Sequence, residues 1–145
     1  MKKLIIAALL TITVATSVFA SDEKKLNVNV LRSFETQFED AEKVKWSSNS
    51  KYIKASFEVN GKKTDAFYNL DGEYIGCTKK ITLEDLPVNA KRTFAKKYSD
   101  YTVKEAIKFD GTEETAYFVS AENDKQSLIL KITGAGVSVF KKTSK

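Results

Sequence analysis

Apolar and polar residues alternate most strictly from Tyr52 to Cys77. This pattern predicts three antiparallel strands joined by two-residue turns at Asn60-Gly61 and Asp71-Gly72, because such dipeptides favour tight hairpins. The expected register pairs Ala55 with Ala66, Ile53 with Tyr68, and Tyr68 with Ile75. One face then carries the core side chains Ile53, Ala55, Phe57, Val59, Ala66, Tyr68, Leu70, Ile75 and Cys77. A register slip by one residue would turn this whole set to water, so the pattern specifies the register.

The residues before this stretch have the period of a helix. Apolar side chains recur every three or four positions from Val30 to Ala41, which predicts about three helical turns beginning at Asn29. Asn27 or Asn29 can cap the start. Alternation resumes at Val44 and Trp46, which predicts a short strand in which Trp46 packs in the core.

The second half follows the same plan. One helical stripe runs from Leu86 to Tyr98, with Pro87 in the first turn and Thr82 or Asp85 as the cap. Four strands are expected at 103–109, 115–121, 127–133 and 137–141, separated by turn residues.

The two halves align with each other. A shift of sixty places Phe34 on Phe94, and a shift of sixty-two places Phe57 on Val119 and Tyr68 on Leu130. The expected fold class is α+β: a tandem repeat of one helix plus four antiparallel strands, with halves at about 29–80 and 82–141. Because four strands and one helix make a small unit, we expect the halves to form one sheet with both helices on one face.

The N-terminal residues have the pattern of a secretory signal peptide. A basic start, an apolar run from Leu4 to Val14 and the small-x-small site Val18-Phe19-Ala20 predict cleavage after Ala20, followed by a flexible leader at 21–28. An uncleaved anchor is the alternative, but the run is shorter than the roughly 20 apolar residues that span a membrane. We therefore expect a periplasmic or secreted protein with no membrane insertion after cleavage.

Charge and composition exclude several function classes. Without residues 1–20 the chain has 22 basic and 19 acidic residues, a net charge of +3, which does not favour nucleic-acid binding. The single cysteine, Cys77, is expected to be a buried apolar residue and cannot form a disulfide within the chain. The absence of histidine removes the commonest general base and metal ligand. We expect no cofactor and no metal.

Several motifs together resemble a known family. They are Val44-Lys45-Trp46, Ala55-Ser56-Phe57, Asn60-Gly61, Phe67-Tyr68, Asp71-Gly72-Glu73, Leu86-Pro87 and Lys97-Tyr98-Ser99-Asp100-Tyr101. Residues 28–141 resemble the secreted PepSY-like family, also described as β-lactamase-inhibitor-like, of bacteria such as the Bacteroidetes. The resemblance implies a tandem helix-plus-four-strand fold with a concave sheet in an exported protein, and it assigns no function. β-Lactamase inhibitory proteins of this shape carry disulfides, which argues against that activity here.

The sheet face opposite the helices is the candidate binding site. Alternation directs large and polar side chains to it, and its candidate binding residues are Tyr52, Lys54, Phe67, Asn69, Tyr74, Phe118, Ile129 and Phe140. They predict a non-enzymatic binding module, inhibitory or not, for an envelope or extracellular protein or peptide. Alternatively, these aromatic residues only stabilise a solvated sheet.

Two further function classes stay open. One is a structural or stress-related envelope protein without a single partner. The other is an enzyme, for which the acidic pairs Glu84-Asp85 and Glu113-Glu114 are the candidates. Both pairs have structural explanations, at a helix start and in a turn, so we expect no enzyme.

Overall fold

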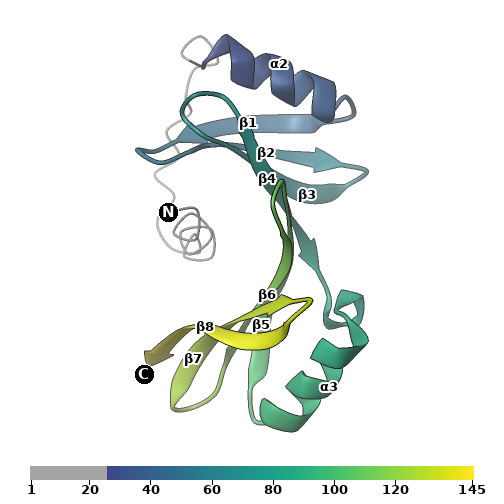
Figure 1. The fold of residues 1–145 in the computed structure, drawn as a ribbon, viewed down its shortest axis with the longest axis vertical. Helices are drawn as coiled ribbons and strands as arrows, with labels where there is room; N and C mark the ends of the chain where they lie inside the picture. The colour runs from purple at the N-terminus through teal and green to yellow at the C-terminus, as the bar shows by residue number, and fades with distance from the viewer. Residues whose placement is uncertain (1–25) are drawn as a thin grey trace. The chain divides into compact units, whose positions relative to one another are not determined.

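The structure, a computed structural model, describes residues 26–145; the expected signal peptide and residues 21–25 of the leader lie outside them. The fold is α+β, with one eight-stranded antiparallel sheet in the order β1 to β8 and two helices (Figure 1). The elements are α2 (Val28–Gln37), β1 (Glu42–Ser48), β2 (Ile53–Val59), β3 (Lys62–Tyr68), β4 (Tyr74–Ile81), the 3₁₀ turn η2 (Leu83–Asp85), α3 (Val88–Lys97), β5 (Thr102–Gly111), β6 (Thr115–Glu122), β7 (Gln126–Thr133) and β8 (Gly136–Ser144).

The chain forms two compact units that divide inside β4. Unit 1 ends at Ile75 and unit 2 begins at Gly76. The reason is the pairing of β4, because its residues from Gly76 to Ile81 are hydrogen-bonded to Gly111 to Ala106 of β5. Most of β4 therefore belongs to unit 2, whereas the sequence pattern assigned it to the first half.

The first hairpin of unit 1 confirms its predicted turn and register. Asn60 and Gly61 both have positive φ, 51° and 73°, as a type I′ turn requires at its two central residues. Ala55 lies opposite Ala66 and Ile53 opposite Tyr68. The β2 and β3 core positions consequently face α2.

The second hairpin differs from the expected two-residue turn. The Asn69 N–H donates to the Glu73 carbonyl at 2.9 Å, and the Gly72 N–H donates to the Asn69 carbonyl at 3.1 Å, which leaves a three-residue loop at 70–72. The expected pairing of Tyr68 with Ile75 is therefore wrong, and β4 is shifted by one residue. Leu70, expected in the core, lies in the loop and is 52% exposed.

Helix α2 begins one residue before the predicted start. The Asn27 side chain accepts a hydrogen bond from the Asn29 N–H at 2.9 Å, which confirms it as the cap. Within the core, the Phe34 ring meets the rings of Trp46 and Phe57 edge to face, each with a centroid distance of 5.0 Å. Trp46 is buried, as expected of a packing residue.

In unit 2 the predicted cap residues close a different turn. The Asp85 carboxylate accepts hydrogen bonds from the Thr82 N–H at 2.8 Å and from its hydroxyl at 3.0 Å, and these bonds fold η2. Pro87 precedes the first helical residue of α3, Val88. The helix packs on a buried cluster of Leu86, Ala90, Ala106, Val119, Leu128, Leu130 and Ile132.

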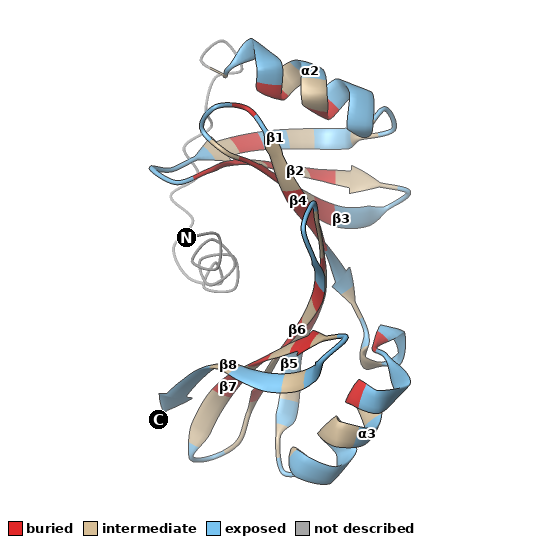
Figure 2. Cartoon of the chain, in the orientation of Figure 1, coloured by how far each residue is buried: buried red, intermediate tan, exposed pale blue. Residues whose placement is uncertain are grey.

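The expected repeat is only partly visible in the burial pattern (Figure 2). Phe57 and Val119 are both buried, but Cys77 is buried where its counterpart Val139 is 51% exposed. The strand order explains this difference, because β4 lies between β3 and β5 whereas β8 is the last strand of the sheet. A tandem repeat with both helices on one face stays a prediction.

Candidate binding face of the sheet

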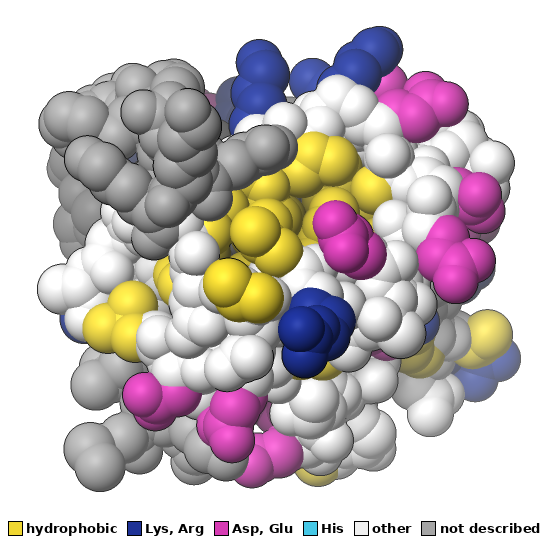
Figure 3. All heavy atoms as spheres, turned by 90° about the horizontal axis from the view of Figure 1, so that it is seen from above, with side chains coloured by type: hydrophobic (Ala, Val, Ile, Leu, Met, Phe, Trp, Pro, Cys, Tyr) yellow, Lys and Arg dark blue, Asp and Glu magenta, His cyan; other side chains and the backbone are white. Residues whose placement is uncertain are grey.

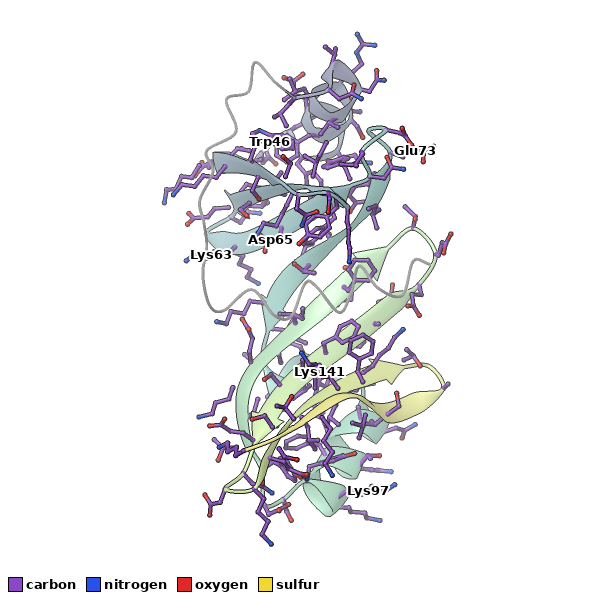
Figure 4. The ribbon with its side chains drawn as sticks, turned by 90° about the vertical axis from the view of Figure 1, so that its left-hand side faces the viewer. Trp46, Lys63, Asp65, Glu73, Lys97 and Lys141 are labelled. Atoms are coloured by element: carbon purple, nitrogen blue, oxygen red, sulfur yellow. The ribbon has the colours of Figure 1, made fainter. Side chains whose placement is uncertain are left out.

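In unit 1 the candidate face lies on the side of β2 and β3 that α2 does not cover. Since Phe57 contacts α2, alternation turns Tyr52 and Lys54 to the opposite side, where Lys54 lies across from Phe67. Figure 4 shows this division, with Trp46 on the side of α2 and Asp65 on the other. We call Tyr52, Lys54 and Phe67 the Tyr52 patch.

The aromatic residues of this patch are buried, which corrects the expectation that they are exposed. Phe67 is 1% exposed and Tyr52 5%. Their rings pack edge to face with centroids 5.4 Å apart, and each ring thereby shields part of the other from water. Lys54 is half-buried and is the accessible member of the patch.

Tyr74 does not belong to this face. Its ring contacts Tyr68 at 5.6 Å and Phe38 of α2 at 6.2 Å between centroids, so it lies on the helix side. The cause is the three-residue loop before β4, because a shift by one residue exchanges the two faces of a strand.

Asn69 has a structural role in the same loop. Its side-chain carbonyl accepts a hydrogen bond from the Glu73 N–H at 2.8 Å, and its amide nitrogen donates to the Glu73 carboxylate at 2.7 Å. Asn at the first position and Gly at the fourth position of a type I turn are a known signal, which Asn69 and Gly72 carry. This signal could have predicted the longer loop.

In unit 2 the candidate face lies on the side of the sheet opposite α3. Phe118, on β6, is fully buried, and its ring meets the half-buried Phe140 of β8 edge to face with centroids 5.5 Å apart. Phe140 lies on this face by alternation from Val139, which pairs with Leu130 on the α3 side, and it is the extra residue of a β-bulge after which Lys141 pairs with Ile129. Phe118, Phe140, the half-buried Ile129 and Lys131 form what we call the Phe118 patch.

The charged member of this patch is held by a carboxylate. Lys131 lies opposite Phe118 on the neighbouring strand, and its Nζ is 2.7 Å from Glu114 Oε1. The Lys131 side chain is 18% exposed, and this ion pair fixes it beside the aromatic pair. Glu114, one of the acids considered for catalysis, is thus used in an ion pair.

A close backbone approach extends the same face of unit 2. Gly76 and Gly111 lie opposite each other on β4 and β5, and the buried Phe109 ring lies over both: a Cβ on Gly76 would meet Phe109 Cζ at 2.8 Å, and one on Gly111 would meet Phe109 Cε1 at 2.5 Å. The sequence reasoning missed Phe109 as a buried residue of this face. Glycine inside a strand, which often marks a close approach, was the signal.

Other polar groups of unit 2 form ordinary ion pairs. Lys108 Nζ lies 2.9 Å from Asp110 Oδ1, and the hydrogen bond that Lys108 donates to this carboxylate raises the pKa of Lys108, against a smaller lowering from partial burial. Within residues 26–145 no three His, Cys, Asp or Glu side chains are placed to hold a metal ion. No helix in the same residues is long and apolar enough to cross a membrane.

The open hollows of the surface lie elsewhere. A polar hollow of about 540 Å³ is lined by Glu39, Asp40, Ala41, Glu42, Asn60 and Gly61. Figure 3, the space-filling view from above, shows hydrophobic side chains gathered in the middle with charged ones around them. The exposed large hydrophobic residues of unit 1 among those described are Val28 and Leu70.

No family model matches the chain, and no curated protein matches it. Several solved structures do match the chain. A DUF2874 family protein from Bacteroides ovatus ATCC 8483 is 19% identical with a TM-score of 0.73, covering 86% of this chain and 89% of that one. A proposed periplasmic protein from Bacteroides eggerthii DSM 20697 is 20% identical with a TM-score of 0.72, covering 81% and 88%. A BLIP-like protein from Bacteroides fragilis NCTC 9343 is 14% identical with a TM-score of 0.69, covering 86% and 92%. At these identities the likeness shows the fold alone: the chain has the fold of BLIP-like proteins from Bacteroides, and its relation to PepSY-like proteins stays a prediction.

Proposed function

We propose that the protein is an exported, non-enzymatic binding module that engages a protein or peptide through the Tyr52 and Phe118 patches. The observation that carries the proposal is the same in both units. In each unit, on the side of the sheet that the helix of that unit does not cover, an edge-to-face aromatic pair is surrounded by lysine and half-buried side chains. An apolar centre with a polar rim is the common anatomy of a protein interface.

Burial changes how these patches would act. The aromatic rings of Tyr52, Phe67 and Phe118 are too buried to insert into a partner, so they form a rigid floor, that is, a packed layer beneath the surface of the patches. The partner contacts the more accessible side chains above this layer, which are Lys54, Ile129 and Phe140. A floor that is already packed loses little conformational entropy on binding, which favours affinity.

Export is part of the same proposal. It rests on the signal-peptide pattern of residues 1–20, and the structural neighbour from Bacteroides eggerthii supports it as a proposed periplasmic protein. N-terminal sequencing of the protein recovered from the periplasm or medium should begin at Ser21. An N-terminus at Met1 in the membrane fraction would contradict export.

The binding proposal is tested by retention of a saturable partner from an envelope extract. Ile129→Asp and Lys54→Glu place charges on the two patches and should each abolish retention, while Arg92→Asp on the exposed side of α3 is the matched control and should retain it. All variants are first checked for an unchanged urea midpoint. Equal retention by the patch variants and the control would refute binding through the Tyr52 and Phe118 patches.

A structural envelope role is the second candidate. The near-complete burial of Tyr52, Phe67 and Phe118 favours it, because buried rings contribute to folding whether or not a partner exists. Absence of any saturable partner, together with normal export, is the result that this candidate expects.

A further inference from the structure

Strand β8 ends the sheet and leaves one backbone edge without a strand. It comes last in the strand order and pairs only with β7. With nine residues, Gly136–Ser144, it is longer than the other edge strand, β1. Most of its residues are exposed, as the pale blue strand in Figure 2 shows. An edge strand of this kind offers its outward N–H and C=O groups to another extended segment.

The charges of β8 are positive and unpaired. Lys141 and Lys142 are exposed, and β8 contains no acidic residue. By contrast, the lysines of β5 and β7 all have a carboxylate: Lys104 with Glu122 at 2.7 Å, Lys108 with Asp110 at 2.9 Å and Lys131 with Glu114 at 2.7 Å. Among residues 26–145 no ion pair within 4.0 Å involves either β8 lysine.

The neighbouring strand cannot neutralise them. Lys141 lies opposite Ile129 and Lys142 opposite Leu128, both apolar. Glu122, at the end of β6, already binds Lys104 and also Lys145, whose Nζ is 3.4 Å from its Oε2. The sheet therefore presents two cations at its edge and uses its own carboxylates elsewhere.

We propose that the edge of β8 binds an extended, acidic peptide segment of another protein as an added strand. Backbone hydrogen bonds along β8 give the affinity, and acidic side chains opposite Lys141 and Lys142 set the register, because opposite charges facing each other across strands are stabilising. Val139, which is 51% exposed, offers an apolar contact to an alternate side chain. This surface is an edge and not the face invoked above, so the inference stands without the proposed function.

Two comparisons favour this occupant. A second copy of β8 would bring the same lysines against this edge, which like-charge repulsion disfavours. Both edge strands contain one register shift, between Glu42 and Lys45 on β1 and at the Phe140 bulge on β8, but β1 is two residues shorter and contains Glu42, whereas β8 contains no acidic residue. Of the two edges of the described sheet, β8 is therefore the one whose charge suits an acidic segment.

The test uses a synthetic nine-residue peptide with glutamate alternating with threonine and valine, titrated against the protein. We expect saturable binding and slower amide hydrogen exchange in β8. The same peptide with alternate backbone amides methylated should bind at least tenfold more weakly, because it cannot form the ladder on its methylated edge. A lysine version of the peptide should not bind.

Protein variants separate the edge from general charge. K141E/K142E should weaken binding at least tenfold, whereas K96E/K97E, the same charge change on exposed lysines of α3, should leave it within about threefold. If both double variants lost the same affinity, or if the methylated and unmethylated peptides bound equally well, net charge alone would explain the binding and the proposal would be overturned. No binding of any peptide would mean that the lysines only prevent edge-to-edge association, and β8 protection that rises with protein concentration would identify a second copy as the occupant; either result also overturns it.

Discussion

The ring of Phe38, just after the last residue of α2, packs on the ring of Tyr74, the first residue of β4, with 6.2 Å between centroids. This contact places Tyr74 under the helix and follows from the three-residue loop that precedes it. We therefore expect Tyr74→Ala to lower the free energy of unfolding by about 1–3 kcal/mol, as loss of a packed side chain does. Leu70→Ala should change it by less than about 0.5 kcal/mol, because Leu70 is exposed in the loop. Urea midpoints measure both changes. A larger loss of stability for Leu70→Ala than for Tyr74→Ala would contradict the three-residue loop and support the two-residue turn expected from the sequence.

The aromatic floor of unit 2 should contribute strongly to folding. Phe118→Ala removes a fully buried ring and should cost about 3–5 kcal/mol, whereas Phe140→Ala, at a half-buried position, should cost less. A double-mutant cycle between them should give a coupling of about 0.5–1.5 kcal/mol, the usual range for an aromatic pair. Additive losses would show that the edge-to-face contact has no energetic role.

The glycine at the start of unit 2 is required by close packing. A Cβ on Gly76 would lie 2.8 Å from the Asp110 carbonyl oxygen and 2.8 Å from the Gly111 Cα, and backbone atoms cannot easily move away. Gly76→Ala should destabilise by about 1–3 kcal/mol. Gly134→Ala is the matched control, because nothing lies within 4 Å of its added Cβ, and it should be neutral or slightly stabilising. Thermal unfolding of the two variants distinguishes these outcomes.

The carboxylate of Glu122 should make stability depend on pH in the acidic range. Its hydrogen bond with Lys104 at 2.7 Å lowers the pKa of Glu122 below the ordinary 4.5, and the charge of Lys145 adds to this. A lowered pKa in the folded state gives stability that is present above pH 4.5 and lost as the pH falls through the folded value. The difference in Tm between the native protein and Glu122→Gln should therefore be positive at pH 7 and vanish at pH 2. Asp124→Asn, which removes an exposed carboxylate, should show a smaller change, and a pH-independent difference for Glu122 would contradict this cause.

The thiol of Cys77 should be protected in the folded protein. Cys77 is buried on β4, which agrees with the expected burial although the β4 register differs from the predicted one. Reaction with a thiol reagent should be slow in buffer and fast in denaturant, since the thiolate must reach solvent to react. Immediate labelling of the folded protein would show that this part of β4 opens.

The sequence by itself determined the elements and the first hairpin. The helices are specified by apolar residues at three- and four-residue spacing, so Val30 and Phe34 could be assigned to the core without a structure. The Asn60-Gly61 turn requires two residues of positive φ, which few dipeptides adopt, and it therefore specified the register of β2 and β3.

Only the tertiary structure decided the remaining features of the candidate sites. The Asp71-Gly72 sequence is compatible with a loop of two or of three residues. The three-residue loop is selected by the hydrogen bonds of Asn69 to Glu73 and by contact with the start of α2, where a Cβ on Gly72 would lie 3.2 Å from the Asn29 Cβ. Alternation directed Phe67 and Phe118 to the face opposite the helices but could not show that this face is buried there, because burial depends on residues distant in the sequence. The sequence likewise could not show that Lys141 and Lys142 have no carboxylate partner among the described residues. In the structure, the apolar residues Ile129 and Leu128 lie opposite them, and Glu122 forms its ion pairs with Lys104 and Lys145.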